Sequence, residues 1–309
     1  MANYITVDGG TTNTRVSLVS DGKILSTKKF SLGARASIGD NTAQRVAIRD
    51  AIGELLDGSG LSAKDITRVL ASGMITSEFG LIKLDHISAP AGIRELHEGM
   101  YETVLEDITD IPFVFIRGVK LASGVLTESD VMRGEETETV GLSAGGHSVY
   151  ILPGSHSKII FTDECERIEK FYTMLTGEMI FALSQSTILK DAVDLTVTDI
   201  NEQYLLDGYR YAASEGLNEA LFKVRILKNM FSAERCEIYS FFLGAVLSGE
   251  IKKVLRLAPE KIVIGGKEQI KLATAMILRA ETDTDVVLCD KETVEESVVR
   301  GAIKIYEFE

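Results

Sequence analysis

The sequence predicts an α/β protein built from two related lobes. Residues 4–30 and 149–175 share one pattern: an apolar strand, a tight turn of small and hydroxylated residues around glycine, a second apolar strand, a polar turn and a third strand-like run. Elsewhere strand patterns alternate with helical ones, which favours a partly parallel sheet. The 309 residues suffice for two domains. We therefore expect an N-terminal lobe over 1–145 and a C-terminal lobe over 146–309.

The N-terminal half alternates apolar runs with turn signals. Strand-like composition predicts strands at 4–8, 14–20, 23–30, 68–74 and 111–119. Asp21-Gly22 is a strong hairpin signal between the second and third of these strands. Helical spacing of apolar residues predicts a helix at 42–57, which Gly58 and Gly60 end, and we expect another helix at 92–107.

The C-terminal half begins after a small, glycine-rich segment, 141–147, which is the expected hinge. Beyond the second copy of the repeated unit, helical periodicity dominates 177–190 and 199–256. We then expect a strand at 261–266, a helix at 268–280, a strand at 285–289 and a final helix at 292–306. That last helix is free to pack back on the N-terminal lobe.

Bulk composition limits the classes of partner. The net charge of −13 and the pI near 4.9 disfavour nucleic acid, which would be repelled overall. No apolar run approaches the ~18 residues of a membrane helix, and the N-terminus enters a strand directly, so we expect neither a membrane span nor a signal peptide. Three scattered cysteines lack metal-ligand spacing and indicate a reduced, cytoplasmic protein.

A glycine turn after the first strand suits a phosphate group. Asp8 and Gly9 precede Gly10, Thr11, Thr12 and Asn13. Glycine lets backbone N–H groups approach an anion closely, and the hydroxyl and amide side chains add donors. Asp8 at the strand end could hold Mg²⁺, mostly through water. Taken alone, a plain hairpin turn with capping hydroxyls is about equally good an explanation.

The second copy of the unit places Gly154, Ser155, His156 and Lys158 at the matching position. Lys158 can supply a point charge to a phosphate, whereas a lone His in a turn more often satisfies a local hydrogen bond. The paired turns favour a nucleotide-dependent phosphoryl transferase. Neither is a P-loop, and there is no GxGxxG. Gly265-Gly266 forms a third small turn after a strand, either near a nucleotide ring or as a simple strand-to-helix connection.

One acidic run suits a catalytic carboxylate. Asp130 precedes an apolar pair, and a kinase that acts on an alcohol needs a base beside the hydroxyl, so Asp130 is the candidate base. Arg133 would share its face if the run is helical and could then bind a substrate carboxylate. The alternative is an N-capping Asp on a solvated acidic helix.

Together these motifs resemble the 2-dehydro-3-deoxygalactonokinase family of the sugar kinase/Hsp70/actin superfamily. DVMRGEET (130–137) is the most specific segment, and DGGTT is shared across many kinases of the superfamily. The remaining matching segments, in the right order over nearly the whole chain, are DGGTTNTR (8–15), LGAR (32–35), SGMITS (72–77), SAPAG (88–92), PGSHSK (153–158) and TGE (176–178).

The resemblance implies two ribonuclease-H-like lobes with ATP and Mg²⁺ in the cleft between them, and transfer of the γ-phosphoryl group to the 6-hydroxyl of 2-dehydro-3-deoxy-D-galactonate in galactonate catabolism. It places Asp8, Gly10, Thr11 and Thr12 in the first phosphate loop. It places Gly154, Ser155, His156 and Lys158 in the second loop, Gly265 and Gly266 near the adenosine, and Asp130 as the base.

The chain departs from the family at Gly9, where a Trp is common, and in LDHISAP (84–90), which is less like the usual Glu-Ala-Pro-Tyr run. Both departures affect the expected identity of the sugar acid more than the expected use of ATP. Arg35 or Arg133 could bind its carboxylate, and Met74 and Ser77 lie at a predicted strand end, where α/β sheets place ligands. For Arg35 a solvated surface position is an equal alternative.

Three other functions remain open. They are a kinase of another sugar acid, a non-catalytic sugar-sensing protein, and an actin- or chaperone-like ATPase, for whose extra subdomains the chain has little room. The oligomeric state is also open, a homodimer included.

Overall fold

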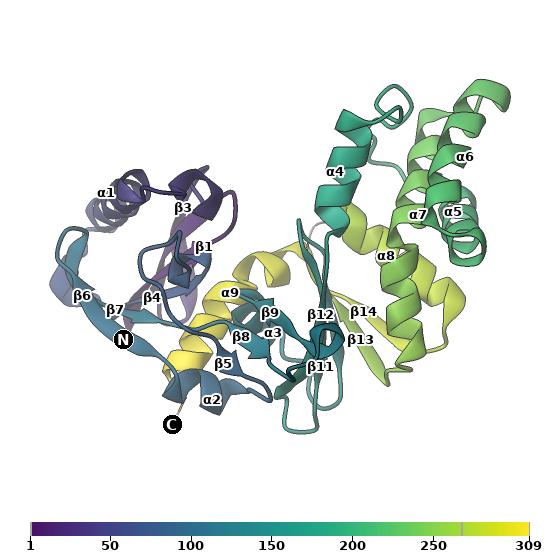
Figure 1. The fold of residues 1–309 in the computed structure, drawn as a ribbon. Coiled ribbons are helices and arrows are strands. Elements are labelled where there is room, and N and C mark those ends of the chain that lie inside the picture. Colours follow the sequence, from purple (N-terminus) through teal and green to yellow (C-terminus); the bar gives the residue numbers. More distant parts are fainter. Residues whose placement is uncertain (1, 267, 309) are drawn as a thin grey trace. The chain divides into compact units, whose positions relative to one another are not determined.

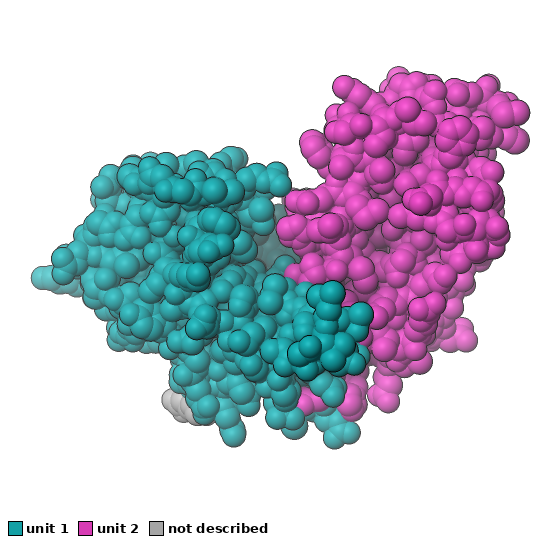
Figure 2. All heavy atoms as spheres, viewed as in Figure 1, with its two compact units in different colours: residues 1–143, 164–170, 292–309 teal, residues 144–163, 171–291 magenta. Residues whose placement is uncertain are grey.

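The computed structural model describes residues 2–266 and 268–308, and these divide into two compact units (Figure 1, Figure 2). Unit 1 comprises 1–143, 164–170 and 292–309, and unit 2 comprises 144–163 and 171–291. The first passage between the units falls inside the glycine-rich segment 141–147. Unit 1 also includes a short return segment, 164–170, and the last helix, which the sequence left free to pack on this lobe.

The main sheet of unit 1 has the strand order β3-β2-β1-β4-β7-β6. Its strands are β1 (Asn3–Gly9), β2 (Thr14–Ser20), β3 (Lys23–Phe30), β4 (Arg68–Gly73), β6 (Tyr101–Leu105) and β7 (Thr109–Phe115). β1 pairs antiparallel with β2 and parallel with β4, and β4 pairs parallel with β7. The carboxyl ends of β1, β4 and β7 therefore lie at one edge of the sheet.

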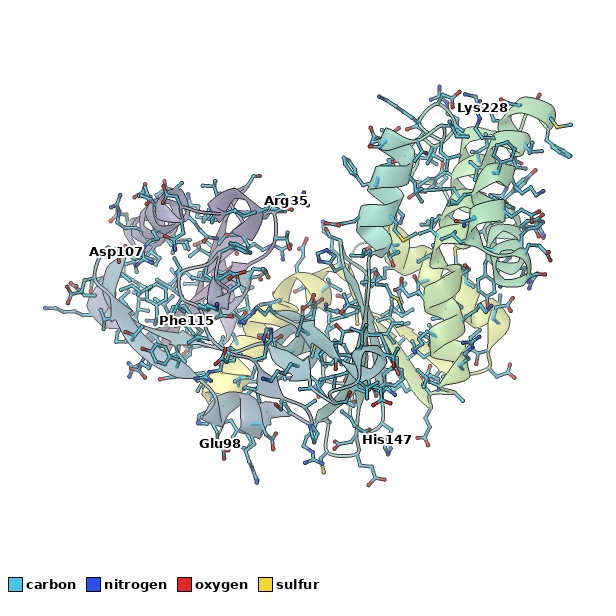
Figure 3. The ribbon with its side chains drawn as sticks, viewed as in Figure 1. Arg35, Glu98, Asp107, Phe115, His147 and Lys228 are labelled. Carbon is cyan, nitrogen blue, oxygen red and sulfur yellow. The ribbon has the colours of Figure 1, made fainter. Side chains whose placement is uncertain are left out.

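One face of this sheet carries the core of unit 1, which α1 (Thr42–Ser59) covers. Ile48, Ile52 and Leu55 of α1 are buried against strand residues such as Phe115, which stacks on Phe113 at 5.5 Å between ring centroids (Figure 3). A smaller sheet pairs β5 (Ile87–Ser88), β8 (Val119–Leu121) and β9 (Asp130–Met132). The other helices of unit 1 are α2 (Ile93–Glu98), α3 (Glu135–Leu142) and α9 (Lys291–Tyr306).

Unit 2 repeats the arrangement with the strand order β12-β11-β10-β13-β14. Its strands are β10 (Val149–Leu152), β11 (Ser157–Thr162), β12 (Ile168–Met174), β13 (Lys261–Ile264) and β14 (Asp285–Leu288). Its helices are α4 (Thr176–Ser186), α5 (Glu202–Glu215), α6 (Leu217–Met230), α7 (Arg235–Arg256) and α8 (Glu268–Glu281). Residues 238–248 of α7 are buried on every side, which makes this helix the centre of the core.

The duplication seen in the sequence is confirmed by the two sheets. In each, a hairpin pairs the first strand antiparallel with the second, and the first strand also pairs parallel with a strand that follows much later, β4 or β13. The same hairpin thus places its turn at the same position in both units.

Part of the predicted helix 92–107 is wrong. Helix α2 ends at Glu98, and 101–105 form β6, which pairs antiparallel with β7. Gly99 caps the helix, and its N–H donates to Glu95 O at 3.0 Å. Likewise the predicted strand 111–119 is two strands, since β7 ends at Phe115 and β8 begins at Val119. Among the described residues, no helix is long and apolar enough to cross a membrane.

Candidate active site

The first glycine turn joins β1 to β2 in unit 1 and is fixed by backbone contacts. Gly10 N–H donates to Asn13 O at 2.8 Å, which closes the turn. The segment after β3 then packs on it: Arg35 N–H donates to Thr11 O at 3.0 Å, and a Cβ at Gly33 would lie 2.5 Å from Gly10 O. The turn is therefore held by a neighbouring loop as well as by its own hairpin.

The end of β4 closes the other side of this turn. Gly73 has φ +79°, and a Cβ there would lie 2.5 Å from Gly9 O and 3.6 Å from Asp8 Oδ1. A Cβ at Gly9 would in turn lie 2.9 Å from Ile75 N. The close approach of three backbone segments thus requires glycine at these positions, and position 9 has no room for the Trp that is common in the family.

Asp8 and the helix α3 bring carboxylates together beside the first turn. Burial raises the pKa of Asp8, and the nearby Arg15 opposes this shift. Burial, with the charges of Glu135 and Asp8, raises the pKa of Glu138 to about 8. Burial and Glu135 likewise raise the pKa of Glu136 to about 8. Burial and neighbouring negative charge both penalise ionisation of these carboxyl groups, and a bound cation would offset that penalty.

These groups fit Mg²⁺ through a small number of direct or water-mediated contacts. Magnesium takes oxygen ligands and keeps several of its waters, so one or two carboxylates are enough. Asp8 and Glu138 are of this chemistry and lie near each other. In the part of the chain that the structure describes, no ready-made group of three or more His, Cys, Asp or Glu side chains could hold a metal by itself.

Glu136 has a different environment from Glu138. Both of its carboxyl oxygens accept from Gly134 N–H at 2.8 Å, and Thr137 Oγ1 lies 3.2 Å from Oε1. Its side chain is fully buried. These contacts hold Gly134, at φ +106°, against Gly73, where its Cβ would lie 3.2 Å from the Gly73 Cα. Glu136 therefore fixes the start of α3 next to the end of β4.

The second glycine turn joins β10 to β11 in unit 2, at the equivalent place. The start of α4 packs directly on it: a Cβ at Gly177 would lie 2.2 Å from Gly154 O, and Glu178 N–H donates to Ser155 O at 3.1 Å. The turn after β13 packs on its other side, since a Cβ at Gly266, with φ +74°, would lie 2.4 Å from Pro153 O. The structure thus brings the second and third predicted turns together within unit 2.

Two polar side chains of this turn have protein partners. His156 Nε2 lies 3.5 Å from Glu178 Oε1, which agrees with the local role considered from the sequence. Lys158 is only 5% exposed, and its ammonium group donates to Thr173 Oγ1 at 2.7 Å. The Lys158 charge is thus held at a fixed position at the start of β11.

A buried carboxyl group lies beneath the same turn. Glu250, on α7, accepts from Thr176 Oγ1 at 2.5 Å, and burial raises its pKa. Hydrogen bonds from Thr176 and Ser157 oppose this shift. The carboxyl group of Glu250 ties the start of α4, and through Gly177 the second turn, to the central helix of unit 2.

The structure corrects the local setting of Asp130 and Arg133. Asp130 begins strand β9 rather than a helix, and it pairs with Leu121 of β8. Arg133 lies between β9 and α3, where its guanidinium donates to Thr76 O at 2.8 Å, Thr76 Oγ1 at 2.7 Å and Leu84 O at 2.6 Å. The two side chains therefore do not share a helical face, and Arg133 links the segment after β4 to the start of α3.

The remaining predicted substrate residues lie in the segments that surround the first turn. Arg35 belongs to a short 3₁₀ helix (Ala34–Ser37) after β3 and is labelled in Figure 3. Met74 begins another 3₁₀ helix directly after β4, which confirms the predicted strand end. Ser77 is buried, and its hydroxyl donates to Met74 O at 2.7 Å.

The sequence reading missed Glu138 and Glu250. DVMRGEET ends one residue before Glu138, so the motif pointed to the region without identifying this side chain. Glu250 is the one charged residue within the stretch Ile238–Ile251, whose other members are apolar or small apart from Tyr239, a pattern that signals a buried polar group.

Comparison with known proteins identifies the family. Residues 8–303 match the family described as 2-keto-3-deoxy-galactonokinase. Over 201 residues, the chain is 30% identical to a Rhizobium meliloti protein provisionally named 2-dehydro-3-deoxygalactonokinase DgoK1, a match that covers 62% of this chain and 59% of that protein. It is 25% identical over 260 residues to the 2-dehydro-3-deoxygalactonokinase of Escherichia coli, covering 81% of this chain and 80% of the relative.

Solved structures share the fold. A Sinorhizobium meliloti protein provisionally assigned as a 2-dehydro-3-deoxygalactonokinase has a TM-score of 0.78 at 20% identity, covering 98% of this chain and 97% of that one. The activator of 2-hydroxyisocaproyl-CoA dehydratase from Clostridium difficile has a TM-score of 0.53 at 15% identity, covering 99% and 94%. The fold class expected from the sequence is thus confirmed. Because the family match spans nearly the whole chain, this protein belongs to the 2-keto-3-deoxy-galactonokinase family.

Proposed function

We propose that this protein is an ATP-dependent kinase that transfers a phosphoryl group to the 6-hydroxyl of 2-dehydro-3-deoxy-D-galactonate. The observation that carries the proposal is the duplicated hairpin: in a chain of this family, each unit holds an equivalent glycine turn whose backbone is fixed by a second glycine segment. Fixed backbone N–H groups at such turns suit the oxygens of a polyphosphate.

In unit 1, the first turn, Gly10 to Asn13, binds phosphate oxygens, and Asp8 would hold Mg²⁺ through its waters, with Glu138 beside it. When bound, the ion neutralises charge on the phosphates and orients them. The positive charge of Arg15 acts on both carboxyl groups and so reduces their repulsion of a polyphosphate.

In unit 2, the second turn, Gly154 to His156, binds phosphate oxygens, and the buried Lys158 supplies a fixed positive charge. Gly266 packs against Pro153, and Gly265 N–H donates to Ile151 O at 3.0 Å, so this turn offers backbone rather than side chains to the adenosine. Glu250 keeps the start of α4 in register with this turn.

A base must orient the acceptor hydroxyl and take its proton. Asp130 is the candidate from the sequence. Glu138 is the candidate from the structure, because a carboxyl group with a pKa of about 8 holds or releases a proton near neutral pH. Arg35, Met74 and Ser77 remain candidates for the substrate contacts around the first turn.

The test is ADP release with ATP-Mg²⁺ and a panel of 2-oxo-3-deoxy sugar acids and aldonates, with ³¹P NMR to identify the phosphorylated position. We expect turnover with 2-dehydro-3-deoxygalactonate and a 6-phosphate product. Turnover restricted to another acid would reassign the substrate, and nucleotide binding without turnover of any acid would favour a sugar-sensing protein.

A further inference from the structure

A cavity in unit 1 lies between one face of the first three strands and the beginning of α9. Its volume is about 470 Å³, which is in the range of small-molecule sites. The strand wall consists of polar side chains from β1, β2 and β3 together with Ile24, and the helix wall includes Glu292, Glu295 and Glu296. This face is opposite to the one that packs on α1.

A row of charged side chains crosses the strand wall. The strand register sets Asp8 opposite Arg15 and Arg15 opposite Lys29, and all three line the cavity. Like charges directly opposite each other on one face are destabilising, so the Arg15–Lys29 pair favours an anion between its members. In residues 2–266 and 268–308, no carboxylate forms an ion pair with either side chain, although the charge of Arg15 acts on Asp8 and Glu138.

A row of hydroxyl groups runs beside the charged row. Thr6 is opposite Ser17, and Ser17 is opposite Thr27, with 2.9 Å between the Ser17 and Thr27 hydroxyl oxygens. All three residues line the same cavity. The cavity therefore offers cations at one place, hydroxyl groups along one wall and carboxylates on the other.

This combination fits a ligand with a single carboxylate and several hydroxyl groups. Hydroxyl groups of the ligand can donate to the glutamates of α9 and exchange hydrogen bonds with the strand hydroxyls. A doubly charged phosphate group is less suitable, because Asp8 and the three glutamates would repel it. Neighbouring strands are about 4.8 Å apart, so the row from Asp8 to Lys29 spans about 10 Å, enough for a six-carbon acid lying across the strands.

We propose that this cavity binds the sugar acid, with Arg15 and Lys29 holding its carboxylate and its terminal hydroxyl lying at the Asp8 end, beside the first glycine turn. The proposal deepens the function given above and rests on it. It also reassigns the carboxylate contact, because the Arg133 guanidinium already donates to Thr76 and Leu84.

Lys29→Gln tests the proposal, and Lys28→Gln is its matched control. The two lysines are adjacent on β3, but Lys28 forms an ion pair with Glu54 of α1 at 2.6 Å, so it points away from the cavity. We expect Lys29→Gln to raise KM for the sugar acid about 10-fold, the effect of losing about 1.4 kcal/mol from a charge-assisted contact. KM for ATP should change less than about twofold in both variants, an amount well below 1 kcal/mol.

A binding measurement separates this proposal from the proposed function. Calorimetry compares a six-carbon aldonate with the uncharged alditol of the same length, and needs no turnover. The wild type and Lys28→Gln should bind the aldonate more tightly, and Lys29→Gln should lose that preference. If the wild type turns over no acid on the panel yet shows this pattern, the kinase assignment fails and the carboxylate site stands.

Three results would overturn the carboxylate site. The first is a rise in KM for ATP alone in Lys29→Gln, which would assign the row of charged side chains to a phosphoryl group. The second is an equal change in KM for the sugar acid in the two lysine variants. The third is equal binding of the aldonate and the alditol by the wild type. Thr27→Val, which removes one hydroxyl from the wall, should weaken both ligands equally.

Discussion

Replacing Glu138 by Gln should make the protein more stable at high pH and nearly inactive. In the folded protein, burial and the charges of Glu135 and Asp8 raise the Glu138 pKa from 4.5 to about 8. Because the folded pKa lies above the unfolded one, the carboxyl group stabilises the fold fully below about pH 4.5, and this contribution is lost as the pH rises to about 8. Gln cannot ionise and should not show this loss.

The size of the effect follows from the shift. At about 1.36 kcal/mol per pKa unit, the full shift corresponds to at most about 5 kcal/mol. Glu138 is only partly buried and shares its charge interactions with Glu135 and Asp8, so we expect about 2 kcal/mol. For a folded unit of this size, a change of about 2 kcal/mol in the free energy of unfolding shifts the melting temperature by about 4–8 °C.

The assay is thermal melting of the wild type and Glu138→Gln, without magnesium, near pH 5 and near pH 9, with exposed Glu128→Gln as control. We expect similar melting temperatures near pH 5 and a higher one for Glu138→Gln near pH 9, together with a fall in kcat of about 10²-fold if Glu138 acts as the base. If the melting temperatures of Glu138→Gln and the wild type differ by the same amount at both pH values, the raised pKa of Glu138 is contradicted.

Three further substitutions test other parts of the site. Asp130→Asn should lower kcat by ~10²-fold if Asp130 is the base, measured by coupled ADP detection, and near-normal turnover would leave that role to Glu138. Gly177→Ala should raise KM for ATP about 10-fold, because its Cβ would lie 2.2 Å from the Gly154 carbonyl oxygen of the second turn. The control Gly249→Ala, whose Cβ would meet no atom within 4 Å, should leave KM unchanged. Similar kinetics in the two variants would contradict a rigid turn. Glu250→Leu should lower the melting temperature, because it leaves the buried Thr176 hydroxyl without its partner at a cost of about 1–3 kcal/mol. Glu250→Gln, which can still accept a hydrogen bond, should melt close to the wild type. Equal losses of melting temperature in the two variants would argue against this hydrogen bond.

Much of the fold could be read from the sequence because its signals are local. Strand alternation, the Asp21-Gly22 hairpin and the helical spacing in 42–57 each depend on residues only a few positions apart, and each is confirmed. The helix expected at 92–107 fails in its second half, where the pairing of β6 with β7 decides the structure. That pairing depends on a second segment of the chain, β7.

The site residues divide in the same way. The glycine turns were recognisable because glycine followed by hydroxylated residues marks a strand-to-strand turn whatever surrounds it. The sequence leaves open whether the run that contains Asp130 and Arg133 is helical, and the structure shows that Asp130 pairs with β8 and Arg133 donates to Thr76 and Leu84. The facing of the first and second turns stays a prediction, for which a crystal structure with bound nucleotide is the test.

By itself, the sequence determined the duplicated α/β units and the position of a glycine turn in each, because backbone preference and apolar periodicity are properties of short segments. Only the tertiary structure decided which charged groups meet. Asp8 is far from Glu138 in the chain yet raises its pKa, and Lys28 and Lys29 are adjacent in the chain yet lie on opposite faces of a sheet. Charge interactions and burial depend on distance in space, which packing sets and sequence separation does not.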